Sequence, residues 1–307
     1  MRWLQAIDRR LFRWGSPVTL AVFRVLAAGL ALTNFLMIAI DFDAWFTENG
    51  YLPAWFASRW TGGLWRINFL SGVQDERITV ALYALVVLAA LLVTVGLVTR
   101  PASIVLFLGA VTLHHRSPDI LHSGDSLMRA WLFVLMISPC AQALSVDRLI
   151  RLARGVASGP PPSISIWPQR LVQFQLAVVY LTTVWHKWGG SDWRDGTAVW
   201  YTINMAELSR LPLPGILTEP ALVAMATYGT LAIEVAMATL VFFRPLRAWV
   251  LLCGLLLHLG IEYSMNIPLF AFTICCGYVC FYDGEELESA WRLVRARFRP
   301  PSPSTES

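Results

Sequence analysis

The sequence is almost free of lysine. Of its 24 lysine and arginine residues, 23 are arginine, and the one lysine is Lys187. Arginine stays protonated in proteins, whereas a lysine held away from water can lose its proton and act as a base. Lys187 ends an apolar run that begins at Leu171. Its position favours proton-transfer chemistry. A general bias toward arginine, or an amine that merely extends to the membrane surface, would explain it as well.

Charged residues of either sign are also scarce. They make up 14% of the chain, against about 25% in soluble domains, while apolar residues make up 56%. The net charge of +4 comes from arginines at loop ends and not from a basic tract, so we expect no nucleic-acid partner. Five cysteines lie in apolar runs without metal-ligand spacing, so we expect no metal site. The N-terminus lacks a cleavage site after a short apolar core, so we expect no removed signal peptide.

What the chain has in place of charge is a series of long apolar segments. They predict an all-α fold, a polytopic transmembrane helical bundle of about eight spans. The third segment is short and ends in two histidines and an arginine, so seven spans is the alternative. The approximate ranges are 18–40, 78–98, 101–115, 127–145, 170–187, 220–243, 246–263 and 267–282.

Fourteen tryptophans suit a protein with wide membrane–water interfaces. The loops at 42–77 and 188–219 mix aromatic and turn residues, which favours short helices lying in the interface. Both loops fall on the side of the predicted bundle that has fewer arginines.

The arginines also predict an orientation. Eight spans put both termini on one side, and arginine is denser there, so the positive-inside rule places the termini in the cytoplasm and the protein in the inner or plasma membrane. Lys187 would then face the outer side. We divide the chain into a cytoplasmic N-terminal segment at 1–17, a transmembrane domain at 18–283 and a cytoplasmic tail at 284–307. The tail is expected to be partly disordered, because it ends in a run rich in proline and serine.

Ionisable residues inside the apolar segments form a separate group. Such a residue at a helix centre costs about 2.5–3.5 kcal/mol on insertion scales, so it usually faces partners or water. Asp125 and Arg129 are four residues apart, as are His258 and Glu262, and such pairs share a helix face. We expect ion pairs that hold the helices in register, with structural roles for Arg24, Arg129, Glu234 and Glu262.

The spacing around Lys187 predicts which side chains share its face. Tyr180, Thr183 and Lys187 lie at positions i, i+3 and i+7 of one helical stripe. His186 is about 100° away around the helix. One of these two neighbours should therefore point into the bundle and the other away from it, unless the helix unwinds at the Gly189-Gly190 pair.

Four stretches, in this order and spacing, resemble a known family. They lie at 46–53 (FTENGYLP), 115–129 (HRSPDILHSGDSLMR), 187–198 (KWGGSDWRDGTA) and 258–270 (HLGIEYSMNIPLF). Together they resemble the bacterial HTTM (horizontally transferred transmembrane) domain family, which is similar to the membrane part of vitamin K-dependent gamma-carboxylase. The resemblance covers roughly 18–283.

The resemblance implies a role for Lys187. A lysine just before an Asp-x-Trp-like turn is the carboxylase's base in the oxygenation of reduced vitamin K, and Lys187 precedes Asp192-Trp193. A neutral amine in a dry pocket could take a proton from a quinol hydroxyl. The expected cofactor is reduced vitamin K or menaquinol, and the expected partner is an isoprenoid quinone or membrane lipid. Candidate catalytic residues are Lys187, His186, His122, Asp125 and His258, and candidate cofactor-binding residues are Tyr180, Thr183 and Trp193.

The sequence also departs from the carboxylase. His186 stands in place of a second lysine, Ser123-Gly124 in place of an Asn-His pair, and the large exoplasmic domain has no counterpart in 307 residues. Carboxylation of a docked protein is therefore not expected, and no protein partner is indicated. Two hypotheses stay open. One is a quinol-dependent oxygenase or carboxylase-like enzyme at the outer face. The other is a non-enzymatic lipid- or quinone-binding protein, transporter or partner subunit.

Overall fold

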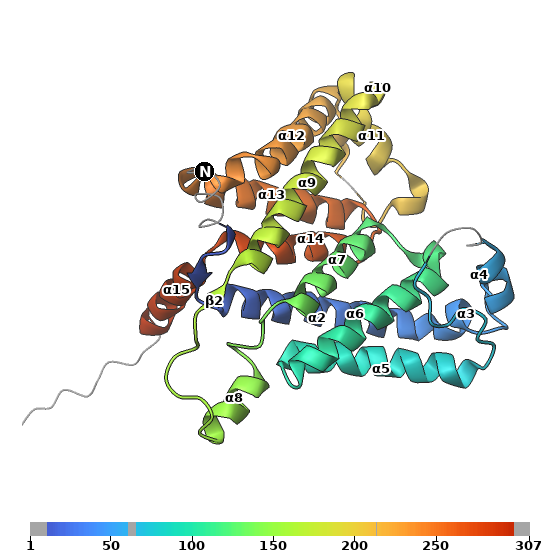
Figure 1. The fold of residues 1–307 in the computed structure, drawn as a ribbon. Coiled ribbons are helices and arrows are strands. Elements are labelled where there is room, and N and C mark those ends of the chain that lie inside the picture. Colours follow the sequence, from blue (N-terminus) through green and yellow to red (C-terminus); the bar gives the residue numbers. More distant parts are fainter. Residues whose placement is uncertain (1–10, 61–65, 213, 298–307) are drawn as a thin grey trace, which may run out of the picture.

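The computed structural model describes residues 11–60, 66–212 and 214–297 (Figure 1). Within these ranges the regular structure is helical except for one antiparallel pair of two-residue strands, β1 (Trp14–Gly15) and β2 (Ile164–Ser165). The prediction of an all-α fold is therefore confirmed.

Helices occupy all eight of the predicted apolar ranges. We refer to them together as the bundle helices. They are α2 (Val18–Ile38), α5 (Glu76–Val95), α6 (Thr99–Arg116), α7 (Ser123–Ile137), α9 (Trp167–Gly189), α12 (Pro220–Ala238), α13 (Arg244–Ser264), and α14 (Phe270–Cys276) with its 3-10 continuation η6 (Gly277–Phe281).

The number of membrane spans is not confirmed. Among the described residues, four helices are long and apolar enough to cross a membrane: α5, α12, α13, and α2 extended through η1 (Ala39–Asp41) and α3 (Phe42–Phe46). α7 has 15 residues, and α14 and η6 have 7 and 5, against about 20 for a spanning helix. α6 and α9 are less apolar, because α6 ends in two histidines and an arginine and α9 carries several glutamines.

α7 ends eight residues before the predicted boundary at 145. Its C-cap Ser138 has ψ 154°, an extended conformation. Pro139 follows, and a proline disfavours helical geometry at the residue before it. The segment 127–145 is thus a short helix followed by a turn, and the amphipathic helix α8 (Val146–Ala153) begins after it.

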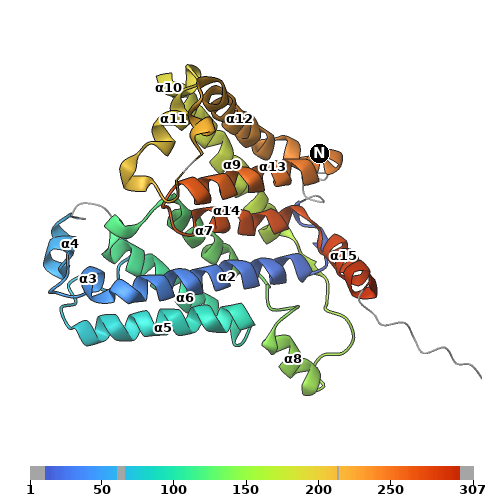
Figure 2. The same cartoon turned by 180° about the vertical axis from the view of Figure 1, so that it is seen from behind.

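Short connections reverse the chain between α5 and α6 and between α13 and α14. Asp75 caps the start of α5, where its carboxylate accepts the Arg77 N–H. Gly96 caps the end of α5, and its φ of 74° turns the chain toward α6. α13 and α14 are joined by a five-residue loop. In two opposite views α2, α5 and α6 lie side by side, while α9 and α12 cross the molecule at a steeper angle (Figures 1 and 2).

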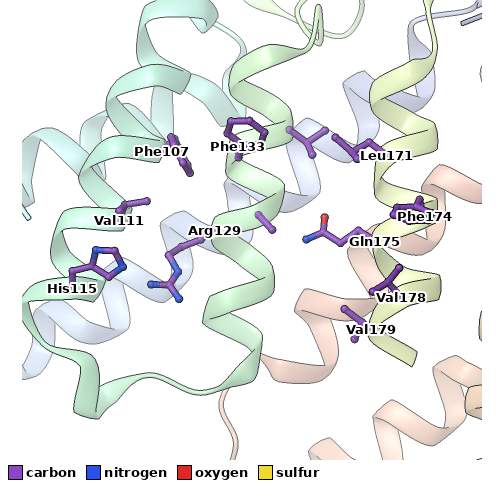
Figure 3. A pocket seen from close by; sticks show the side chains of 12 residues that line it. Phe107, Val111, His115, Arg129, Phe133, Leu171, Phe174, Gln175, Val178 and Val179 are labelled. Atoms are coloured by element: carbon purple, nitrogen blue, oxygen red, sulfur yellow. The ribbon is translucent and has the colours of Figure 1, made fainter. Parts of the chain in front are cut away.

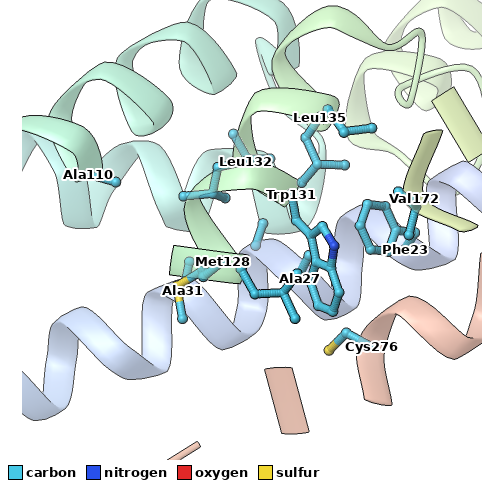
Figure 4. Packing of buried hydrophobic residues seen from close by; sticks show 14 of the residues in the cluster. Phe23, Ala27, Ala31, Ala110, Met128, Trp131, Leu132, Leu135, Val172 and Cys276 are labelled. Atoms are coloured by element: carbon cyan, nitrogen blue, oxygen red, sulfur yellow. The ribbon is translucent and has the colours of Figure 1, made fainter. Parts of the chain in front are cut away.

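Trp131 of α7 is the centre of the buried core (Figure 4). Its ring meets Phe23 of α2 edge to face, with centroids 5.5 Å apart. Ala27 and Ala31 on α2 allow the two helices to approach closely, as small residues do in membrane bundles. Gly277 lies on the other side of the indole, where a β-carbon would come within 2.9 Å of the ring. Contact of this kind supplies the packing that holds α2, α7 and η6 together.

Arg24 is fully buried in α2, and the structure gives it a role other than the expected ion pair. Its Nη1 donates to the Val93 carbonyl at 3.2 Å and its Nη2 to the Leu144 carbonyl at 2.5 Å. Val93 lies in the last turn of α5, where carbonyls without helical partners attract a cation. Within the described ranges Arg24 forms no ion pair, so it ties helix ends to each other and does not neutralise Glu234.

Arginines gather at the end of the molecule that carries β1 and α15 (Gly284–Arg297). Arg13, Arg170 and Arg244 approach Asp283 at 2.5, 3.6 and 3.5 Å. This cluster fastens the start of α15 to the bundle. Residues 284–297 of the tail, which was predicted to be partly disordered, are helical. Residues 1–10 and 298–307 lie outside the described residues, and so do the arginines in them that supported the predicted orientation.

The opposite end carries the short helices expected in the two long loops. These are α4 (Ala54–Trp60), α10 (Ser191–Arg194), α11 (Ala198–Ile203), η3 (Ala206–Leu208) and η4 (Gly215–Thr218), with η2 (Pro118–Ile120) between α6 and α7. Residues 61–65 of the first loop are outside the described part of the chain.

Candidate functional site

Lys187 and Glu234 bring together two bundle helices. Lys187 lies two residues before the end of α9, and its Nζ is 2.5 Å from Oε1 of Glu234 in α12. The glutamate side chain is 6% exposed and the lysine side chain 22%. The Trp193 ring of α10 lies on the amine as well, with its centroid 4.6 Å from Nζ, a cation–π distance. The amine is therefore held between a carboxylate and an indole.

A second polar group lies two turns earlier on α9. The Tyr180 hydroxyl is 2.9 Å from Nε2 of His258 in α13 and 2.7 Å from the Tyr278 hydroxyl in η6. All three side chains are buried. The charge of Lys187 acts on His258 and that of Glu234 acts on Tyr180, so the two groups lie within electrostatic range of each other. We call Lys187, Glu234, Tyr180, His258 and Tyr278 the Lys187 cluster.

Two buried polar atoms of the Lys187 cluster have no hydrogen-bond partner, Glu234 Oε2 and His258 Nδ1. A buried polar atom without a partner costs about 1–3 kcal/mol. Glu234 Oε2 can accept an O–H, and His258 Nδ1 can donate or accept depending on its tautomer. These two atoms can form hydrogen bonds with a hydroxyl group. Within the described ranges no three His, Cys, Asp or Glu side chains gather as metal ligands.

His122 and Asp125 form a reciprocal cap at the start of α7. His122 Nδ1 accepts the Gly124 N–H at 3.0 Å, and Asp125 Oδ2 accepts the His122 N–H at 2.9 Å. Because Nδ1 accepts, the proton lies on Nε2, which donates to the Pro268 carbonyl at 3.0 Å. Asn34 of α2 donates to Asp125 Oδ1 at 3.2 Å. These contacts join α7, α2 and the loop before α14.

One aromatic ring links this cap to the Lys187 cluster. The Phe270 ring centroid is 6.4 Å from that of His122 and 5.6 Å from that of His258. His122 and Asp125 line a cavity of about 200 Å³, and Lys187 is not part of its lining. The structure thus brings His258 to the lysine but places His122 and Asp125 in a neighbouring, separate polar group.

Within the described ranges the side chains of His186 and Thr183 form no hydrogen bond with the Lys187 cluster. α9 stays helical through Gly189, so His186 points away from Glu234 and is exposed. The Thr183 hydroxyl donates to the Val179 carbonyl of its own helix at 2.7 Å. Of the adjacent pair at 186 and 187, the lysine is therefore the one that faces another helix.

Arg129 and Glu262 do not form the ion pairs expected of them within their own helices. Arg129 Nη2 donates to Ser126 Oγ at 3.1 Å, while Asp125 is held by Asn34 and His122. Glu262 pairs with Arg210 of the 188–219 loop and not with His258. Asp125 and Glu262 have loop or cap partners because both carboxylates lie near helix ends.

Two members of the Lys187 cluster were not anticipated as such from sequence. Glu234 was expected only to hold helices in register, although a lone lysine and a lone deep glutamate are complementary charges that could have been paired. Tyr278 gave less signal, because a tyrosine among apolar residues resembles an interfacial aromatic.

Comparison with known proteins places the chain in a family. A family model described as HTTM domain matches residues 12–285. No curated protein and no solved structure matches the chain. The matched residues include all the bundle helices and every member of the Lys187 cluster. The chain therefore belongs to the HTTM domain family.

Proposed function

We propose that this membrane protein is a quinol-dependent enzyme in which the Lys187–Glu234 pair accepts a proton. The observation that carries the proposal is the 2.5 Å contact between the one lysine of the chain and a buried carboxylate on another helix. The cofactor would be reduced vitamin K or menaquinol, and Glu234 Oε2 and His258 Nδ1 would hold it through hydrogen bonds. When bound, a quinol supplies an acidic O–H and reducing equivalents.

The pair has the properties of a proton acceptor. Lys187 Nζ donates to Glu234 Oε1 at 2.5 Å, so a proton can pass between the amine and the carboxylate along this hydrogen bond. When that proton lies on Glu234, Lys187 Nζ is a free base. Trp193 covers the amine and limits access of water, which strengthens electrostatic interactions at the site. Glu234 Oε2 provides a second acceptor for an O–H.

Tyr180, Tyr278 and His258 form a second hydrogen-bonded polar group near the pair. The Tyr180 hydroxyl is within hydrogen-bond distance of both His258 Nε2 and the Tyr278 hydroxyl, so a proton can move between these atoms by exchange of hydrogen bonds. Within this group Tyr180 positions His258. Lys187 remains the base.

We also propose the inner or plasma membrane as the location, with both termini in the cytoplasm. The dense arginines of the predicted cytoplasmic side support this orientation, and Arg13, Arg170 and Arg244 meet at the end that carries β1 and α15. The Lys187 cluster would then lie toward the outer leaflet.

A second candidate is a non-enzymatic quinone- or lipid-binding protein, transporter or partner subunit. The same ion pair favours it, because a lysine already matched by a carboxylate and an indole is stable as a charged pair without turnover. In this case Lys187 and Glu234 would hold α9 against α12, and a quinone bound at the cluster would leave unchanged.

Oxidation of menaquinol by the purified protein in liposomes under oxygen separates the two. The enzyme hypothesis predicts oxidation by the wild type and a loss of at least about 100-fold in Lys187→Arg, the size of a general-base contribution. The matched control is His186→Asn, an exposed neighbour that should change the rate less than twofold. Full activity in Lys187→Arg would refute the base assignment. Co-purified quinone without turnover would establish the second candidate.

A further inference from the structure

A groove on the side of the bundle lies outside the Lys187 cluster. It has a volume of about 660 Å³ and runs between α6, α7 and α9 (Figure 3). Phe107, Phe133 and Phe174 form much of its apolar lining. Along α6 it extends from Phe107 to His115, eight residues or about 12 Å of helix. The groove is open, apolar and elongated, which suits a hydrocarbon chain.

Positive charge is concentrated at one end of this groove. Arg129 and His115 lie together at that end (Figure 3), and Arg66 is close enough for its charge to act on both. His115 Nδ1 is 2.9 Å from the Ile67 carbonyl, which leaves Nε2 for another partner. The groove therefore has an apolar body and a basic end.

No carboxylate in the described part of the chain forms an ion pair with the arginines at this end. Arg129 donates to a neutral serine, and within the described ranges neither Arg129 nor Arg66 forms an ion pair. Asp125, the carboxylate whose charge reaches Arg129, accepts hydrogen bonds from Asn34 and the His122 N–H. An arginine guanidinium is well suited to bind phosphate through two parallel hydrogen bonds.

We infer that the groove binds one anionic phospholipid, with an acyl chain between α6, α7 and α9 and the phosphate on Arg129. Two arginines that form no ion pair within the described ranges favour a lipid of net negative charge over a zwitterionic lipid, whose own ammonium group would be repelled. His115 and Arg66 lie at the loop end of the groove, where a headgroup would meet the interface. The inference does not depend on the proposed enzyme, because Arg129 is not part of the Lys187 cluster.

Native mass spectrometry of the detergent-purified protein, titrated with phosphatidylglycerol and phosphatidylcholine, tests this site. The wild type should bind one phosphatidylglycerol about five- to tenfold more tightly than phosphatidylcholine. Arg129→Gln should abolish that preference. Arg77→Gln removes the same charge from an exposed position at the start of α5, and this variant should keep the preference for phosphatidylglycerol. Lys187→Arg should also bind as the wild type does.

A second variant tests the apolar body of the groove. Val111→Trp fills the groove beside α6 and should reduce binding of both lipids at least tenfold, with elution in size-exclusion chromatography showing that the fold is retained. Equal affinity of the wild type for both lipids would overturn the inference, as would retention of the preference in Arg129→Gln. An isoprenoid quinone as the only tightly bound species would overturn it as well.

Discussion

A β-carbon on Gly96 would lie 1.8 Å from Nη1 of Arg24, which is far closer than van der Waals contact allows. The glycine also has φ 74°, a conformation that favours glycine. The buried arginine therefore reaches the carbonyls of Val93 and Leu144 only because the residue that ends α5 has no side chain. Two separate requirements, backbone conformation and space, meet at this one position.

We expect Gly96→Ala to destabilise the protein by at least about 2 kcal/mol, because overpacking a buried site adds to the left-handed backbone cost. Gly155→Ala is the matched control. Gly155 has φ 69° and no neighbouring atom within 4 Å of an added β-carbon, so it should lose only about 1 kcal/mol. Thermal unfolding in detergent gives both values, and equal melting temperatures for the two variants would contradict the role of Arg24.

The Lys187–Glu234 pair should show strong coupling in a double-mutant cycle. Removing one partner leaves the other buried without compensation, so Lys187→Met and Glu234→Gln should each destabilise the protein. The double variant should be less damaged than the sum of the two, with a coupling of about 1–3 kcal/mol. Denaturation of the four proteins in the same detergent measures this. Additive effects would mean that the pair makes no net contribution to stability.

Asp147 should make stability depend on pH in the acid range. Its carboxylate accepts the N–H groups of Val98 and Thr99 at 2.8 and 2.9 Å and the Thr99 hydroxyl at 2.7 Å, which caps α6. Burial alone would raise the pKa of this carboxyl, but the hydrogen bonds and the Arg151 charge together lower it.

A pKa lowered by folding contributes stability that is present above the unfolded value and is lost as pH falls through the folded value. The wild type should therefore lose stability below about pH 4, where an unfolded aspartate titrates. Asp147→Asn should be less stable at neutral pH and should show a smaller change across that window. Asp119 is exposed, so Asp119→Asn should show the same pH dependence of stability as the wild type. If Asp147→Asn showed the wild-type pH dependence, Asp147 would not be its cause.

The reciprocal cap of α7 predicts a structural effect for Asp125. Asp125→Ala removes acceptors for the His122 N–H and for Asn34, and should cost about 0.5–2 kcal/mol of stability. Because Lys187 lies outside this group, the amount of co-purified quinone should stay the same. Loss of quinone at unchanged melting temperature would instead show that Asp125 contacts the ligand.

Helix positions were largely predictable, because they depend on local apolar content. The ends of α2, α5, α9 and α13 agree with the predicted segments within a few residues. α7 differs, and the cause was visible in the sequence: Ser138-Pro139 ends the helix where hydropathy alone continued it. The span count was less predictable, because length, polarity and tilt together decide whether a helix crosses the membrane.

Partners of the buried charges could not be predicted in the same way. The sequence suggested ion pairs within one helix, such as Asp125 with Arg129 and His258 with Glu262. In the structure these side chains turn to Asn34, Ser126, Tyr180 and Arg210. A spacing of four residues makes a contact possible, but the side chains bind the partners that the packing brings closer. Ser126 lies on the same helix as Arg129, whereas Asn34, Tyr180 and Arg210 lie on other helices or loops.

By itself, the sequence determined that this is a helical protein of the HTTM domain family with long apolar segments, because composition and motif order are properties of the chain. Only the tertiary structure decided that Lys187 meets Glu234, 47 residues later, and that Arg24 meets carbonyls. The physical reason is that buried charges bind whichever group the packing of separate helices brings within about 3 Å, and that packing is set by contacts far apart in the chain.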